Sequence, residues 1–167
     1  MISMMSRSLV IGFGNISRAD DSAAWHIINS LRRKMGREAL SEEDTGLEEL
    51  GLSTDTIFVS QLPPELIDVL IDYERVIFVD AHIDACLDNL HCDPVEPHSA
   101  PPAFSHHTTP AMILALLEAI HSRTPVGWLV SVRGYDFDFR PDLSPQTLSL
   151  IEPATQKILE LIATNQK

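Results

Sequence analysis

Short apolar runs alternate along the chain with longer segments in which apolar residues recur at helical spacing. Runs of β-branched, aromatic and aliphatic residues predict strands, whereas the helical spacing predicts amphipathic helices. The predicted strands are residues 8–13, 56–60, 76–79 and 127–132, with a further edge strand near Leu90. The predicted helices are residues 21–34, 63–72 and 109–123, followed by a last helical region from residue 144.

Prolines and glycines mark where these elements start and break. Thr109 and Pro110 are typical of a helix cap and first turn. Pro153 is expected to kink or divide the last helical region, whose apolar face includes Leu148, Ile158, Leu161 and Ile162. Residues 36–55 are acidic and broken by glycines, so we expect a surface excursion with at most a short helical turn.

Strands that alternate with helices of this length are typical of βαβ units, in which the strands run parallel. The sequence therefore predicts an α/β fold of three layers, with a mainly parallel, twisted central sheet flanked by helices, as in phosphorylase- and hydrolase-like proteins. Residues 76–79 are all apolar, which indicates a strand buried on both faces, and we expect it to end at Asp80. The length of 167 residues fits a single domain over residues 1–167.

Charge and composition narrow the possible partners. The chain has 12 Lys and Arg against 24 Asp and Glu and forms no basic patch, which argues against a nucleic acid partner. No apolar run approaches the roughly 20 residues that span a bilayer, and no export signal is visible, so we expect a cytoplasmic protein without a membrane partner. Cys86 and Cys92 are predicted to be free thiols. No large apolar stripe remains outside the predicted core, which favours a monomer.

Acidic and histidine residues follow three separate elements. Asp20 and Asp21 come after the first strand, Asp80 after the most apolar one, and His106 and His107 precede a helix. Because the carboxyl ends of parallel strands meet at one edge of a sheet, we expect these side chains to lie together. Two carboxylates and an imidazole suit a divalent metal such as nickel or zinc. Taken alone, each acid also fits a cap or turn, and each histidine a solvent-facing position.

Three motifs occur in order along the chain: Gly12-x-Gly14-Asn15-x-x-Arg18-x-Asp20-Asp21, then Val79-Asp80-Ala81, then Ser105-His106. Together they resemble the motifs of the hydrogenase maturation proteases, and the resemblance extends from Leu9 to about Ile162. Residues 61–65 and 132–134 are similar to members that serve cytoplasmic, soluble nickel–iron hydrogenases.

The resemblance implies an endopeptidase that removes the C-terminal extension of a hydrogenase large-subunit precursor after nickel insertion. It places the catalytic and metal-binding roles on Asp21, Asp80 and His106, with His107 as the alternative to His106. The substrate supplies the nickel, and zinc or cadmium is expected as a substitute ion in the isolated protein. The implied loop and substrate-contact residues are Gly14, Asn15, Arg18, Asp20, Gln61 and Glu65. No Ser-His-Asp or Cys-His arrangement stands out, which favours metal-assisted hydrolysis.

The chain also departs from the family pattern. Ala19, Ser22 and Ala24 stand where glycine is common, and residues 60–65 replace a glycine-rich segment linked with substrate recognition. These departures keep a second hypothesis open, namely a non-catalytic protein of the same fold that binds a metal or the hydrogenase precursor. Arg18 has three open interpretations: a partner of Asp20, a contact to a substrate carboxylate, or a solvated loop residue.

Overall fold

A computed structural model describes residues 6–99 and 107–164, which build a sheet of five strands in the order β2-β1-β3-β5-β4. β1, β2, β3 and β5 run parallel, and the edge strand β4 runs antiparallel to β5. The strands are β1 Ser8–Phe13, β2 Thr54–Val59, β3 Arg75–His82, β4 Leu90–Val95 and β5 Val126–Arg133.

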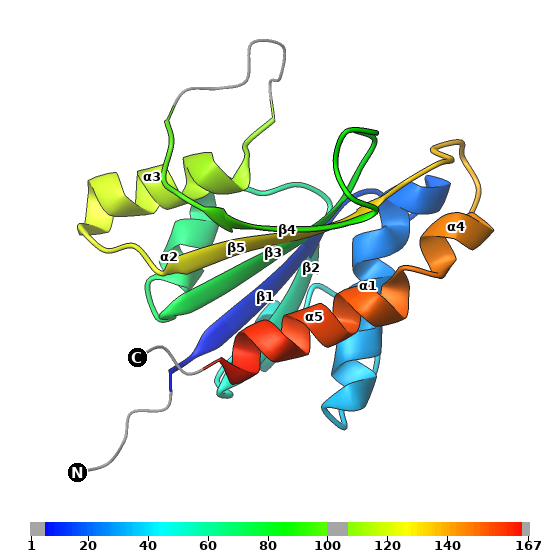
Figure 1. Ribbon diagram of the computed structural model, residues 1–167. Coiled ribbons are helices and arrows are strands. Elements are labelled where there is room, and N and C mark those ends of the chain that lie inside the picture. Colours follow the sequence, from blue (N-terminus) through cyan, green and yellow to red (C-terminus); the bar gives the residue numbers. More distant parts are fainter. Residues whose placement is uncertain (1–5, 100–106, 165–167) are drawn as a thin grey trace.

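Helices cover both faces of the sheet. In Figure 1, α1 (Ala23–Lys34) and α5 (Ile151–Ala163) lie side by side on one face, and α2 (Ile67–Leu70) and α3 (Pro110–His121) cover the other. A short helix, α4 (Pro145–Leu148), precedes α5. Three single turns of 3₁₀ helix complete the described structure: η1 Ala19–Ser22, η2 Leu47–Glu49 and η3 Pro64–Leu66. The three-layer α/β architecture predicted from the sequence is confirmed.

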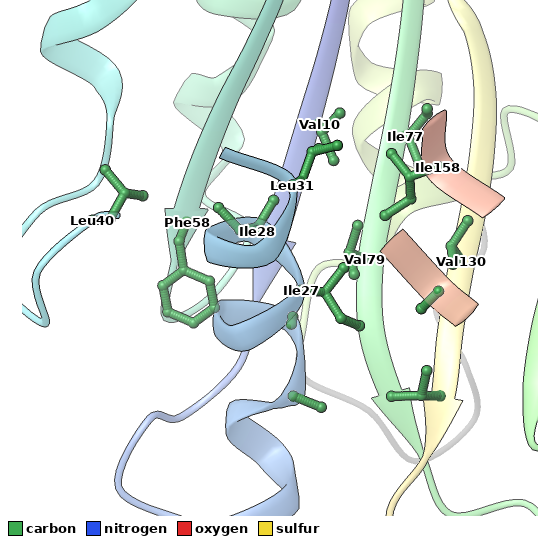
Figure 2. Close-up of a cluster of buried hydrophobic side chains, with 14 residues drawn as sticks. Val10, Ile27, Ile28, Leu31, Leu40, Phe58, Ile77, Val79, Val130 and Ile158 are labelled. Carbon is green, nitrogen blue, oxygen red and sulfur yellow. The ribbon is translucent and has the colours of Figure 1, made fainter. Parts of the chain in front are cut away.

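The core is divided by the sheet into two clusters. Ile77 and Val79 of β3 pack with α1 and α5, as Figure 2 shows, whereas Val76 and Phe78 pack with α2 and α3. All four side chains are fully buried, which explains why residues 76–79 of this strand are all apolar. Burial of each side chain contributes about 1.5–3 kcal/mol to folding. The two clusters hold the strands rigidly, so the loops at their carboxyl ends start from fixed points.

Several predicted boundaries are corrected by the structure. β3 does not end at Asp80 but continues to His82, because its last residues pair in register with β5. The predicted helix 21–34 begins as the 3₁₀ turn η1, and α1 follows from Ala23. The predicted helix 63–72 is reduced to η3 and α2, which end at Leu70. The predicted edge strand near Leu90 and the cap at Thr109 are confirmed, with Thr109 Oγ1 accepting from Met112 N–H at 3.3 Å.

The last helical region is divided, but not at Pro153. α4 ends at Leu148 and α5 starts at Ile151, which places Pro153 in the first turn of α5, where no backbone N–H is needed. Leu148 was predicted on the buried face and is instead 60% exposed, whereas Ile158 is fully buried. Within residues 6–99 and 107–164, none of the helices combines the length and apolar character needed to cross a membrane.

Candidate active site

A cleft of about 1200 Å³ opens where β1, β2 and β3 end. Its walls come from the loop after β1, the acidic excursion between α1 and β2, the turn after β2, the end of β3 and the residues before α3. In open α/β sheets, ligands bind at this carboxyl edge. Among the described residues, those lining the cleft are 13–16, 18, 21, 42–45, 58–64, 80, 107 and 108.

The loop after β1 is folded tightly around Asp21. The backbone N–H of Asn15 donates to the Asp21 carboxylate at 2.9 Å, which fixes the orientation of this half-buried side chain. Gly14 has a φ of +147°, and a Cβ at this position would collide with the backbone carbonyl of Asp21. Glycine is therefore needed here for both the conformation and the close approach.

Asp20, the neighbour of Asp21, is fully buried and faces away from the cleft. Its carboxylate accepts hydrogen bonds from the N–H groups of Tyr135, Asp136 and Ser144 and from the Ser144 hydroxyl, at 2.7–2.9 Å. Burial alone would raise the pKa of Asp20, but these hydrogen bonds outweigh it and hold the pKa below its usual value. Asp20 thus fixes residues 134–144 to the loop after β1.

Asp80 lies one residue beyond the last pairing between β3 and β1, which joins Gly12 and Val79. Its Oδ1 accepts a hydrogen bond of 2.8 Å from the N–H of Ala81. Burial raises the pKa of Asp80 to about 7; the Ala81 hydrogen bond opposes this rise, and the nearby carboxylate of Asp21 adds to it. A carboxyl whose pKa is raised by burial next to a second carboxylate is typical of a functional site.

The two predicted histidine ligands differ in what the structure describes. His107 is exposed and lines the cleft together with Asp21 and Asp80. His106 lies outside the described residues. Among the residues that are described, no three His, Cys, Asp or Glu side chains are arranged to hold a metal ion. The described part of the site therefore places the Asp21 and Asp80 carboxylates and the His107 imidazole on one cleft, but not in an arrangement that would hold a metal ion by itself.

The remaining predicted contact residues divide between cleft and surface. Gly14, Asn15, Arg18 and Gln61 line the cleft. Glu65 is exposed on η3 and is not among the described lining residues.

Arg18 does not pair with Asp20. Its Nε donates to the backbone carbonyl of Phe137 at 3.0 Å, and its guanidinium lies 4.9 Å from the centre of the Phe139 ring. In the described part of the chain this guanidinium forms no ion pair. The first of its three interpretations is therefore wrong.

The positions where glycine was expected do not obstruct the cleft. Ala19 has a φ of +41°, a conformation that costs a residue with a Cβ about 1–2 kcal/mol. Its N–H donates to the carbonyl of Arg140 at 2.8 Å, so contacts with residues 134–144 stabilise it. Ser22 donates its hydroxyl to the Ala19 carbonyl at 2.7 Å, and Ala24 is buried in the core. None of the three is among the described cleft-lining residues.

Two features of the site were not predicted. Glu42, Glu43 and Asp44 form an acidic wall of the cleft, because Phe58 N–H bonds the Thr45 carbonyl at 2.9 Å and draws the excursion to β2. The attachment of residues 134–144 to Asp20 was also missed. An acidic, glycine-containing run looks like any solvated loop, and a contact across more than 100 residues leaves no local signal.

Comparison with known proteins supports the predicted fold. No protein-family model and no curated protein matches the sequence. Solved structures do match. The hydrogenase maturating endopeptidase HybD from E. coli is 21% identical in sequence, with a TM-score of 0.66, and the match covers 93% of this chain and 91% of the HybD chain. The nickel–iron hydrogenase maturation protease HybD from Thermococcus kodakarensis is 16% identical with a TM-score of 0.66, and the match covers 93% of this chain and 99% of that HybD chain.

A third solved structure agrees with these two. The maturation protease HycI from Thermococcus kodakarensis is 17% identical with a TM-score of 0.64, and the match covers 95% of this chain and 94% of its own. The chain therefore has the fold of the hydrogenase maturation proteases, as the motifs around Asp21 and Asp80 had indicated.

Proposed function

We propose that the protein is a hydrogenase maturation endopeptidase, which hydrolyses one peptide bond near the C-terminus of a nickel-loaded hydrogenase large-subunit precursor. Asp21 and Asp80 bind the nickel that the substrate carries, and His106 supplies the imidazole, with His107 as the alternative. The observation that supports this most strongly is the convergence of Asp21 and Asp80 in one cleft, on a fold shared with proteins named as endopeptidases of this kind.

The shape of the cleft suits a polypeptide substrate. Its volume of about 1200 Å³ exceeds the roughly 300–1,000 Å³ of typical small-molecule pockets. Gln61 and the prolines after β2 line the same cleft as the loop around Asn15 and the two carboxylates. An extended chain can enter such a cleft while the folded body of its own protein stays outside.

The nickel ion performs two tasks in this proposal. It joins the precursor to the cleft, because carboxylates and imidazole from this chain complete the coordination begun by the substrate's own ligands. It also holds the scissile carbonyl close to Asp21 and Asp80, and positioning of this kind lowers a barrier by up to about 7–11 kcal/mol. The same ion can polarise the carbonyl or activate a water molecule.

The residue assignment is tested by measuring cleavage of the nickel-loaded precursor by single variants. Asp21→Asn and Asp80→Asn are expected to reduce the cleavage rate at least about 100-fold, since each removes a charge next to the ion. His106→Ala is expected to do the same, and His107→Ala to have a smaller effect. Asp68→Asn is the matched control, because Asp68 is an exposed acid on α2, away from the cleft.

The same experiment distinguishes an endopeptidase from a non-catalytic protein that binds the precursor. If the wild-type protein binds the precursor in a nickel-dependent complex but leaves it intact, the protein is a binding protein and the endopeptidase proposal is wrong. If both aspartate variants cleave at the rate of Asp68→Asn, the site has been assigned to the wrong residues.

A further inference from the structure

A second hollow, of about 330 Å³, adjoins the cleft. It is lined by Ile16, Ser17, Glu42, Phe139, Arg140 and Pro141. Ile16 and Glu42 line the larger cleft as well, so the two hollows share a wall, and we call them together the groove. Its larger part is lined by Asp21 and Asp80 among others, and the second hollow by Phe139, Arg140 and Pro141 of the 134–144 loop.

Phe139 is the most exposed large apolar side chain in the described part of the chain, at 79%. It forms part of the hollow together with Ile16, which is half-buried, and Pro141. The guanidinium of Arg18 lies over the Phe139 ring, and Arg18 itself lines the cleft. An exposed aromatic ring at the end of a groove loses water-accessible apolar area when a partner side chain covers it, which favours binding.

The 134–144 loop is attached to the cleft by a dense set of contacts. The backbone N–H groups of Ala19 and Asp20 bond the carbonyls of Arg140 and Asp136 at 2.8 and 2.9 Å. The Asp20 carboxylate takes four hydrogen bonds from the same loop. The backbone on either side of Phe139 is therefore held against the loop that carries Asp21, and a preorganised loop of this kind binds without the cost of ordering it.

We propose that this hollow is a subsite for an apolar side chain of the C-terminal extension that the enzyme removes. This inference rests on the proposed function and names the part of the substrate that the groove holds. A chain end can follow the groove past Arg18 to Phe139, whereas the folded body of a precursor cannot enter it. The Arg18 guanidinium, which forms no ion pair in the described part of the chain, is available for a carbonyl or carboxylate of the same extension.

The subsite is tested by steady-state cleavage of the nickel-loaded precursor by three Phe139 variants. Phe139→Ala and Phe139→Asp are expected to raise KM about tenfold or more with little change in kcat, because the contact is made equally in the ground and transition states. Phe139→Leu should restore most of the affinity. Leu52→Ala is the matched control. Leu52 is also an exposed apolar residue, at 50%, but it precedes β2 and so lies at the amino ends of the strands, whereas the cleft lies at their carboxyl ends.

Binding to the cleaved product identifies which part of the substrate occupies the hollow. Phe139→Asp should weaken binding of the precursor but leave binding of the mature large subunit, which lacks the extension, unchanged. Equal weakening for both would overturn the inference and identify a docking surface for the folded body. An unchanged KM in an active enzyme would also overturn it while leaving the proposed function intact. A wild-type protein that neither binds nor cleaves the precursor would refute both.

Discussion

The hydroxyl of Ser144 donates a hydrogen bond of 2.7 Å to the carboxylate of Asp20, across 124 residues of sequence. The adjacent carboxylate, Asp21, lines the cleft instead. The two neighbouring aspartates thus differ in their surroundings: Asp20 holds two loops together inside the protein, and Asp21 faces the cleft. This division explains how a surface loop can keep Asp21 in a defined position.

The first prediction concerns the stability provided by Asp20. Asp20→Asn should lower the free energy of unfolding by about 3 kcal/mol, because a buried hydrogen-bonded charge is replaced by an amide whose N–H groups face other donors. Ser144→Ala should cost about 1–2 kcal/mol. Urea unfolding measures both, and Asp68→Asn should stay within about 0.5 kcal/mol of wild type. An Asp20→Asn variant as stable as wild type would contradict this role.

The second prediction is a loss of stability in acid. The pKa of Asp55 is lowered: burial would raise it, but hydrogen bonds from the Tyr73 hydroxyl at 2.7 Å, from two backbone N–H groups and from Arg7 outweigh this effect. Asp20 behaves in the same way. A lowered folded-state pKa stabilises the fold above the unfolded value of about 3.9, and this contribution is lost as the pH falls through the folded pKa.

Melting temperatures measured from about pH 7 to about pH 2.5 check this sign. The wild-type curve should fall steeply below about pH 4, and Asp55→Asn should start lower and fall less steeply. Parallel curves for the two proteins would show that Asp55 contributes nothing to the acid transition.

The third prediction has the opposite pH dependence. Because the folded-state pKa of Asp80 is raised to about 7, ionisation of this carboxyl costs stability, and the cost grows from about pH 4 to pH 7. In metal-free protein, Asp80→Asn should therefore be more stable than wild type at about pH 8, with little difference at about pH 4. Thermal unfolding in the presence of a chelator measures this. If Asp80→Asn and wild type were equally stable at both pH values, burial would not destabilise the ionised carboxyl of Asp80.

The fourth prediction compares two glycines. Gly14→Ala should destabilise the protein by at least about 1 kcal/mol and abolish cleavage, because the added Cβ meets the Asp21 carbonyl at a φ of +147°. Gly51 has a φ of +135°, but a Cβ added there would meet no atom within 4 Å, so Gly51→Ala carries the conformational cost alone. Cleavage by Gly51→Ala should stay near wild type. Loss of cleavage in both variants would assign the effect to general destabilisation.

Much of the fold could be predicted from the sequence because it depends on local patterns. The apolar run of β3, the glycines at the end of β1 and the capped start of α3 each carry their signal within a few residues. The end of β3 could not be placed, since pairing with β5 carries it past Asp80 to His82. The exposure of Leu148 could not be predicted either, because the last helical region divides between α4 and α5 at residues 149–150 and not at Pro153.

The candidate site could also be predicted only in part. The sequence predicted parallel strands, which bring Asp21 and Asp80 to the same edge of the sheet, and the structure adds that β1 and β3 are direct neighbours. The buried role of Asp20 was not accessible, because its four hydrogen bonds come from residues more than 100 positions away. Phe139 was not singled out either, because Tyr135, Phe137 and Phe139 alternate with aspartates, and nothing in that alternation shows which ring is most exposed.

The central claim is tested most directly by intact-mass spectrometry of a hydrogenase large-subunit precursor after incubation with this protein. The precursor is supplied in two forms, with and without nickel, at equal concentration. We predict that the nickel-loaded form loses a single C-terminal peptide and that the nickel-free form keeps its full mass. An unchanged mass for the nickel-loaded precursor, or equal cleavage of both forms, would contradict a nickel-dependent endopeptidase.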